Sequence, residues 1–243
     1  MLQRSGWHGV MTKITKEEFL EILNKRKLGE RISFIKYEFE PMDLSGLDLS
    51  YIDFSLSSLQ NVILRNVNFE NACLENALFD GTDLHGANFK NASLSRSTFR
   101  FCDMGECNIC GANLFAAVLE SANKEGIVSD ETTKWFRLYC PEEGAFLGYK
   151  KCVNDRLVQL LIPADAKRTS STMRCCRCDK AKVLTIKSFD YTQNFSEAWS
   201  LVDEDFVYKV GEWVEAKNFN PDRWYDSTGG IHFWMTREEA KAY

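Results

Sequence analysis

Residues 82–116 read TDLHG ANFKN ASLSR STFRF CDMGE CNICG ANLFA when they are divided into blocks of five. The third residue of each block is large and apolar. This spacing extends back to Phe34 and forward to Leu119, and it breaks at Lys124. A period of five fits neither an α-helix nor a β-strand, so it indicates a chain that turns a corner after every block. The 18 large positions are Phe34, Phe39, Leu44, Leu49, Phe54, Leu59, Leu64, Phe69, Leu74, Phe79, Leu84, Phe89, Leu94, Phe99, Met104, Ile109, Leu114 and Leu119.

Two other positions of the block are also selective. The residue two before the large one is small from Ala72 onward, and it is larger earlier, as at Leu47 and Val62. The residue two after the large one is repeatedly Asn or Gly, as at Asn66 and Gly86, and these types tolerate the left-handed or tight-turn backbone of a corner. We therefore expect one small and one large side chain of each block to point inward and three to point outward.

Blocks such as Thr82-Asp83-Leu84-His85-Gly86 match the A-(D/N)-L-x-x signature of pentapeptide-repeat proteins, and residues 34–119 resemble that family. The resemblance implies a right-handed quadrilateral β-helix with four blocks in each coil. Eighteen blocks would make about 4.5 coils, and a spacing of about 4.8 Å between strands would make a rod about 22 Å long. The expected fold is mainly β, a solenoid (residues 34–123) with an N-terminal capping helix and a C-terminal α+β domain.

The ends of a solenoid expose apolar side chains and unpaired strand edges, so they are expected to carry caps. Thr15 and Glu18 have the spacing of a capping box, and apolar residues from Phe19 to Leu28 follow at helical spacing until Gly29. Residues 1–33 are therefore interpreted as a tail and a capping helix, with residues 1–10 disordered or the result of an upstream start site. Residues 124–139 are expected to be a linker or a C-terminal cap.

The nine cysteines are an odd number scattered through the chain, so we expect free thiols rather than disulfides. Cys102 and Cys107 fall in the small inward position, whereas Cys110 falls in an outward one. Cys107 and Cys110 have CxxC spacing, and Cys175-Cys176-Arg177-Cys178 is a dense cluster. Neither is followed by a second pair of ligands at zinc-finger spacing. No metal site and no cofactor are therefore predicted.

The five-residue period is absent from residues 140–243. Apolar and β-branched stretches predict strands near residues 146–153, 157–162, 183–189 and 206–214, and a capping box at Thr236 predicts a terminal helix. We infer a compact α+β domain. This segment resembles an uncharacterised domain that follows pentapeptide repeats in some bacterial and phage proteins, in stretches such as Gly148-Tyr149-Lys150-Lys151 and Gly230-Ile231-His232-Phe233.

Charge is distributed unevenly along the chain. Residues 41–123 contain ten acids and four bases, whereas six bases and one acid lie between Lys167 and Lys182. Basic and hydroxyl residues on a loop could hold phosphate groups, so a nucleotide or nucleic acid is one candidate ligand. The alternatives are a solvated loop or an intramolecular clamp on the acidic rod. The candidate phosphate ligands are Lys167, Arg168, Arg174 and Arg177.

Residues 230–233 and the helix expected after them also resemble the Gly-Ile-Tyr-Phe strand and following helix of ADP-ribosyltransferase-type folds, with His232 in place of the usual Tyr. In that family these elements line a nicotinamide pocket. The resemblance implies His232, Tyr208 and Glu238 as candidate catalytic residues, although the upstream His or Arg motif has no counterpart.

The leading interpretation is a non-catalytic protein-interaction module, an acidic rod carrying a domain that binds a partner or a phosphate-containing ligand. The alternatives are an ADP-ribosyltransferase-like enzyme and a DNA mimic that inhibits a nucleic-acid enzyme; a phage or anti-defence role would suit each. A protein partner is expected, and a homodimer is compatible with the family resemblance. No apolar run reaches the ~20 residues of a membrane span, and no signal peptide is recognisable, so a cytoplasmic protein is expected.

Overall fold

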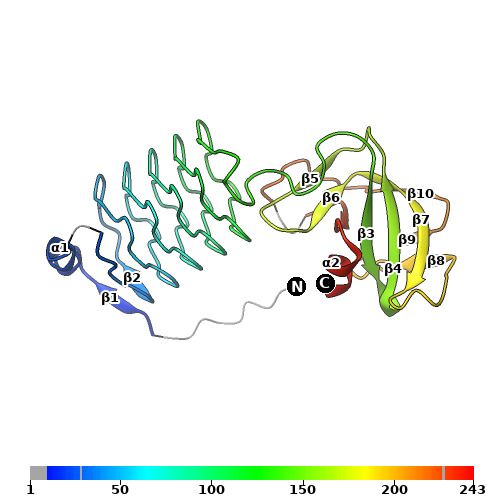
Figure 1. Ribbon diagram of the computed structural model, residues 1–243, viewed down its shortest axis with the longest axis horizontal. Coiled ribbons are helices and arrows are strands. Elements are labelled where there is room, and N and C mark those ends of the chain that lie inside the picture. The colour runs from blue at the N-terminus through cyan, green and yellow to red at the C-terminus, as the bar shows by residue number, and fades with distance from the viewer. Residues whose placement is uncertain (1–9, 28, 226–227) are drawn as a thin grey trace. The chain divides into compact units, whose positions relative to one another are not determined.

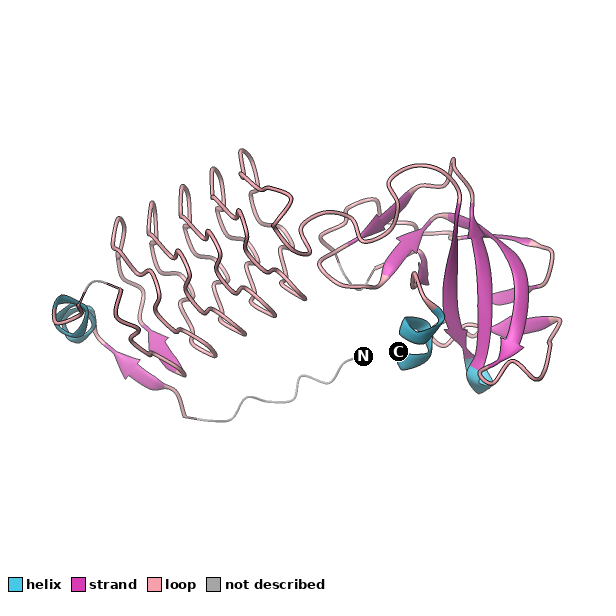
Figure 2. Ribbon diagram, in the orientation of Figure 1, coloured by secondary structure: helices cyan, strands magenta, loops and turns pink. Residues whose placement is uncertain are grey.

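The computed structural model describes residues 10–27, 29–225 and 228–243. The chain divides into two compact units, Met1–Phe136 and Arg137–Tyr243. The first is a regular coil made mostly of loops and turns, and the second is built mostly of strands (Figures 1 and 2). The tail expected for residues 1–10 and the helical position of Leu28 lie outside the described residues, apart from Val10.

Parallel backbone pairing between residues 20 apart builds the coil. Four ladders run through it, starting at Ser33, Glu38, Asp43 and Asp48, and they continue at 20-residue steps except for the last step, from Asn113 to Lys134, which spans 21 residues. Successive turns therefore lie side by side, with four blocks in each turn (Figure 1). The N–H of Leu84, for example, donates to the carbonyl of Asp103 at 2.8 Å. The unit is thus mainly β although few of its residues form long strands.

The large position of each block fills the interior of the coil. All 18 of these side chains are buried, and most are completely inaccessible. Phenyl rings one turn apart are stacked, with centroids 5.0 Å apart for Phe79 and Phe99 and 5.1 Å apart for Phe69 and Phe89. The inward positions predicted from the period are confirmed.

The corner position, two residues after the large one, has a left-handed backbone as expected. Asn66 has φ +55° and Gly86 has φ +70°. Larger residues occupy the same conformation elsewhere, including Tyr51 (φ +61°) and Phe101 (φ +59°). A Cβ makes this region unfavourable, and Asn offsets the cost by local hydrogen bonding of its short polar side chain, so Tyr51 and Phe101 carry a backbone cost that Asn or Gly largely avoids.

The first turn is preceded by a strand and a helix. Strand β1 (Thr12–Ile14) pairs in parallel with β2 (Tyr37–Phe39), and helix α1 (Lys16–Asn24) follows β1. The predicted capping box is present, since Glu18 N–H donates to Thr15 Oγ1 at 3.2 Å and Thr15 N–H donates to Glu18 Oε2 at 3.0 Å. Phe19 is completely buried, and its ring lies 5.0 Å from that of Phe34. Phe19 of helix α1 therefore packs among the aromatic rings of the first turns. Strand β1 was not expected from the sequence.

The coil also continues beyond its apolar period, into the segment 124–139 expected to be a linker or cap. Backbone bridges join Asn108 to Val128 and Asn113 to Lys134. Lys124, which takes the place of the large apolar residue, donates from Nζ to the carbonyls of Leu119 and Ala122. Backbone pairing thus persists after the apolar signal has stopped.

The second unit contains two antiparallel sheets and a hairpin. One sheet has the order β10-β7-β4-β3 and the other β11-β6-β5, while β8 pairs with β9. The described residues of this unit contain one α-helix, α2 (Arg237–Ala242), and a 3-10 turn at Val153–Asp155, so the expected α+β domain is mainly β. The strands are β3 (Phe146–Cys152), β4 (Arg156–Ile162), β5 (Arg168–Ser170), β6 (Cys176–Cys178), β7 (Lys180–Ser188), β8 (Glu197–Trp199), β9 (Val207–Lys209), β10 (Trp213–Glu215) and β11 (Ile231–Phe233).

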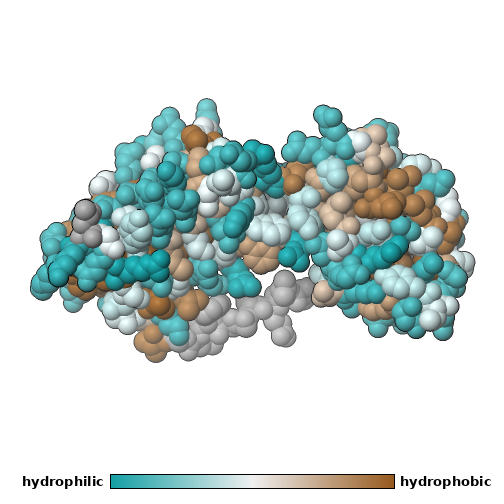
Figure 3. Space-filling model, in the orientation of Figure 1, coloured by the Kyte–Doolittle hydropathy of each residue, from teal (hydrophilic) through white to brown (hydrophobic). Residues whose placement is uncertain are grey.

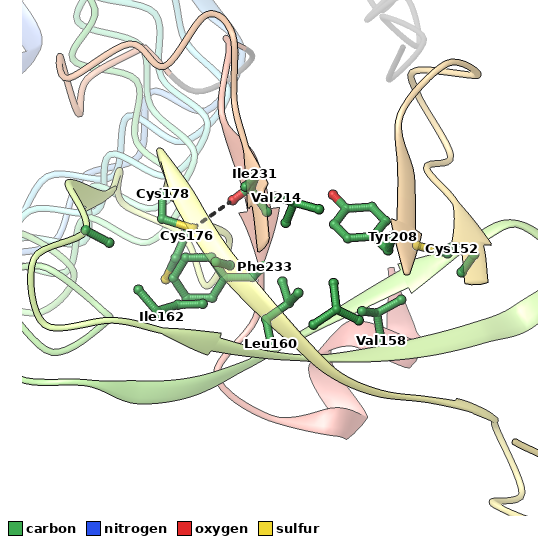
Figure 4. Packing of buried hydrophobic residues seen from close by; sticks show 14 of the residues in the cluster. Cys152, Val158, Leu160, Ile162, Cys176, Cys178, Tyr208, Val214, Ile231 and Phe233 are labelled. Carbon is green, nitrogen blue, oxygen red and sulfur yellow. Dashed lines mark hydrogen bonds between the residues drawn. The ribbon is translucent and has the colours of Figure 1, made fainter. Parts of the chain in front are cut away.

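The core of this unit lies where inward side chains of β4, β6, β9 and β11 meet (Figure 4). It contains Val158, Leu160, Cys178, Tyr208 and Phe233. A smaller apolar cluster, formed by Leu157, Trp234 and Ala240, holds helix α2 against the opposite face of β4. The β-type stretches and the terminal helix predicted from the sequence are confirmed, with β9 and β10 dividing the last stretch into two.

The inward register of the coil predicts contrasting effects of aspartate at Leu84 and at Lys90. Leu84→Asp would bury a carboxylate with no partner, and we expect it to cost more than about 4 kcal/mol and to abolish soluble folded protein. Lys90→Asp lies on the exposed side and should leave thermal melting nearly unchanged. Equal melting temperatures for the two variants would contradict the register.

Candidate functional site

The interior of the coil offers no reactive group. Cys102 and Cys107 occupy the small inward position, and their Sγ atoms donate to the carbonyls of Phe79 (2.9 Å) and Leu84 (3.1 Å). Burial raises the pKa of both thiols to about 12, so they stay protonated at neutral pH. Cys110 is half-buried on the outside.

Outward Asp and Asn residues precede the large position and serve the backbone. Asp83 and Asp103 accept from the N–H groups two residues later, at 3.2 and 3.0 Å, and Asn88 and Asn108 accept in the same way at 3.1 and 3.0 Å. Neighbouring turns are joined as well, since Asn88 Nδ2 donates to Asn68 Oδ1 at 2.9 Å. The two residue types are thus interchangeable for the turn and differ in the charge they place on the surface.

Phe101 is more exposed than the other large apolar side chains described on this surface, such as Tyr51, Ile63 and Val128. It occupies a left-handed corner and is 70% exposed. The same corner one turn earlier is Gly81, and one turn later it is Ser121, so the ring stands beside small residues. Arg100, next to it, pairs with Asp80 at 3.6 Å and with Glu120 at 3.4 Å. An exposed aromatic ring is therefore bordered by charged side chains.

In the second unit, His232 on β11 faces the thiol of Cys175. Its Nδ1 lies 3.5 Å from Cys175 Sγ, and its Nε2 lies 2.9 Å from the carbonyl of Thr228, to which it donates as an N–H. Burial lowers the pKa of His232, and the Thr228 carbonyl opposes that effect. A neutral imidazole with Nε2 protonated leaves Nδ1 free to accept the thiol proton, which is the arrangement of a general base beside a nucleophile.

The second unit also contains a buried charge, at Lys150 on β3. This side chain points into the core from β3, with 6% of its surface exposed, and its Nζ donates to the carbonyl of His232 at 3.2 Å. Burial lowers its pKa, because the apolar surroundings disfavour the ammonium form. Its sequence context predicts only a strand residue, within the Gly148-Tyr149-Lys150-Lys151 stretch of the family resemblance, and does not predict its burial.

The three candidate catalytic residues are not brought together. Tyr208 is buried in the core, its ring 5.9 Å from Lys150 Nζ, and burial raises its pKa. Glu238 is exposed in the first turn of α2. It is Glu239 that makes contacts, accepting from Tyr139 Oη at 2.5 Å. Of the three, His232 alone has a reactive neighbour in the described contacts.

The candidate phosphate ligands do not converge either. In the pairing of β5 with β6, Arg168 lies opposite Cys178 and the next residue, Thr169, lies opposite Arg177. The two arginines therefore point to opposite faces of the sheet. Arg168 donates to the carbonyls of Gly144 (2.6 Å) and Pro163 (2.7 Å).

Arg174 and Arg177 are also engaged within the domain, whereas Lys167 is exposed. Arg177 is buried and donates to the carbonyls of Asp222 (3.0 Å) and Tyr225, while Arg174 lies 3.7 Å from Glu239. Residues 169–172, whose hydroxyls were expected to face a ligand, are all buried. A phosphate site in this loop stays a prediction. The described side chains do not converge on a common point where a phosphate group would bind.

Comparison with known families follows this division of the chain. Residues 32–120 match the model of the pentapeptide repeat region, and residues 136–240 match a family of unknown function (DUF5758). The coil is therefore a pentapeptide-repeat region, as its periodicity indicated. The second unit is a domain of that uncharacterised family. A search of curated proteins gives no match.

Similar solved structures are pentapeptide repeat proteins. One from the Arabidopsis thaliana thylakoid lumen is 31% identical over 37% of this chain and 64% of its own length, with a TM-score of 0.35. HetL of the cyanobacterium Nostoc, involved in heterocyst differentiation regulation, is 25% identical over 37% and 41%, with a TM-score of 0.26. Rfr23 of the cyanobacterium Cyanothece is 25% identical over 51% and 83%, with a TM-score of 0.24. This chain thus covers less than two thirds of the first two proteins.

None of the nine cysteines forms a disulfide, and no group of three metal-ligating side chains occurs among the described residues. No helix in the described part of the chain is long and apolar enough to cross a membrane.

The thiol environments predict selective alkylation of the native protein. Cys175 should react with iodoacetamide, while Cys102 and Cys107 stay protected until the protein unfolds. His232→Gln should slow the reaction of Cys175, because no base then accepts its proton, and should leave Cys110 unaffected. Peptide mass spectrometry after timed labelling measures both; an unchanged Cys175 rate in the variant would show that His232 does not act as its base.

Proposed function

We propose that residues 34–123 form a right-handed quadrilateral β-helix, capped by α1, that binds a partner protein through its outward surface and has no catalytic chemistry of its own. The observation that carries the proposal is Phe101. Its ring is exposed and its backbone is left-handed, so it is unfavourable for folding in two ways. A strained and exposed residue on a rigid scaffold is typical of a binding position.

The surroundings of Phe101 support the same interpretation. Binding hot spots are typically aromatic residues enclosed by a polar rim, and Arg100, Asp80 and Glu120 supply such a rim. The face of the coil that Figure 3 shows is mostly hydrophilic, with a few scattered apolar patches. Since residues 41–123 carry a net charge of −6 (four bases minus ten acids), the complementary surface is an apolar pocket bordered by basic residues.

Rigidity favours such a role. Inward side chains fill the coil along its length, and each turn is hydrogen-bonded to the next. A preorganised surface loses little conformational entropy on binding, so its contacts contribute more fully to affinity. The second unit, with its Cys175–His232 pair, is not part of this proposal.

Replacing Phe101 by Asn should separate binding from stability. Asn tolerates the left-handed corner, so Phe101→Asn should raise the stability of the coil by about 1 kcal/mol while weakening partner binding at least about tenfold. Tyr51→Asn is the matched control, because it relieves the same backbone cost at another corner and should leave binding unchanged. The melting temperature and the affinity for the partner, which the cross-linking experiment described next identifies, are measured on both variants.

A photo-reactive phenylalanine analogue at position 101 identifies the partner independently. It should cross-link one protein that the same analogue at position 51 does not capture. Retention of that partner by Phe101→Asn, or equal cross-linking from both positions, would sink the proposal.

The acidic surface gives a second test, through the double variant Asp83→Asn and Asp103→Asn. Asn keeps the side-chain acceptor that the turn needs, as it does at Asn88 and Asn108, so melting should change little. The loss of two negative charges should lower the partner's association rate and reduce its dependence on salt. Stopped-flow or surface-based kinetics at two ionic strengths would show this, and an unchanged salt dependence would exclude these aspartates from the interface.

A further inference from the structure

A polar depression lies on the face of the β3-β4-β7 sheet opposite the core, and the proposed function of the coil does not use it. Its volume is about 270 Å³. Its floor is a row of side chains from three paired strands, since Tyr149 lies opposite Gln159 and Gln159 lies opposite Thr185. The lining residues are Tyr149, Leu157, Gln159, Thr185, Lys187, Tyr191 and Arg237.

The floor is ordered by hydrogen bonds. Thr185 Oγ1 donates to Gln159 Oε1 at 3.1 Å, and Gln159 Nε2 lies 3.5 Å from Tyr149 Oη. The row therefore presents a fixed set of polar atoms rather than mobile surface side chains. Leu157, buried beneath it, gives the floor an apolar base.

Two cations stand at this depression, and its lining contains no acid. Lys187 projects from β7 on the same face as Leu157, its cross-strand partner. Arg237 opens helix α2, and its guanidinium carbon lies 5.2 Å from the ring of Tyr149 and 5.4 Å from that of Tyr191. Contact with two aromatic faces holds the guanidinium in place without neutralising its charge.

Neither cation is neutralised by a carboxylate in the described residues, where the ion pairs of this unit involve Lys151, Arg174 and Lys180 instead. The nearby Asp190 is turned to its own loop, accepting from Ser188 Oγ at 2.5 Å and from Thr192 N–H at 3.1 Å. The depression thus holds two positive charges available to a ligand.

We propose that this depression binds a small phosphate monoester. A phosphate monoester carries about −1.5 to −2 charges, which two cations match, and its oxygens accept from a guanidinium in a bidentate manner. The organic part lies against the tyrosine rings, while Gln159 and Thr185 supply hydrogen bonds at its polar edge. A volume just below the ~300 Å³ of the smallest typical ligand pockets restricts the ligand to about the size of a mononucleotide or a sugar phosphate.

The test is calorimetric titration of the full chain at low salt with adenosine 5′-monophosphate, glucose 6-phosphate, inorganic phosphate and adenosine. At least one monoester should bind saturably with a dissociation constant below about 1 mM, and more tightly than inorganic phosphate or adenosine. The preferred monoester distinguishes a nucleotide from a sugar phosphate as the source of the phosphate group.

Variants locate the binding. Arg237→Gln and Lys187→Gln should each weaken it at least about tenfold without lowering the melting temperature, because both side chains reach solvent. Lys209→Gln removes the same charge from an exposed position on β9, outside the lining, and should have little effect. The proposal is overturned by no saturable binding of either monoester, by equal affinity for inorganic phosphate, or by equal weakening in Lys209→Gln.

Discussion

The backbone hydrogen bond from a residue in one turn to a carbonyl 19 positions later, in the next turn, is the interaction on which the coil depends. It can repeat regularly only if successive turns have the same length, so each block of the apolar period has five residues and each corner turns the chain in the same way. The left-handed corners and the filled inward positions are both consequences of this requirement. It also explains why an outward Asp or Asn recurs. Its side chain accepts from the N–H two residues later, which has no partner in the ladder.

Local periodicity is what made the coil predictable. Every large inward position could be assigned because a large apolar residue recurs at a fixed interval, and the corners followed from Asn and Gly. The pairing of β1 with β2 had no such signal, because a strand of three residues before a helix lacks a pattern of its own. The continuation to Lys134 was hidden for a related reason: the ladder is made by the backbone, which pairs whether or not the side chain is apolar.

In the second unit, the strands could be predicted from the sequence but the contacts of the charged side chains could not. Strands were recognisable from composition, but the destinations of charged residues depended on contacts between segments far apart in the chain. The basic stretch resembled a ligand loop, yet Arg168 and Arg177 satisfy main-chain carbonyls and the neighbouring hydroxyls are buried. Conversely, Lys187 and Arg237 are 50 positions apart and became neighbours only through the docking of α2 on the sheet. The Cys175–His232 contact, likewise, joins a loop to a distant strand.

The one-dimensional stacking of the coil has a mechanical consequence. Each turn contacts only the turns before and after it, so a force applied at its C-terminal end loads a few backbone hydrogen bonds at a time. Extension would release the chain in steps of 20 residues, each lengthening the molecule by about 60 Å once the spacing of the stacked turn is subtracted. At the other end, Phe19 is locked among the rings of the first turn, so unravelling from that side requires helix α1 to detach first. The resistance of the coil to mechanical unfolding therefore differs between its two ends.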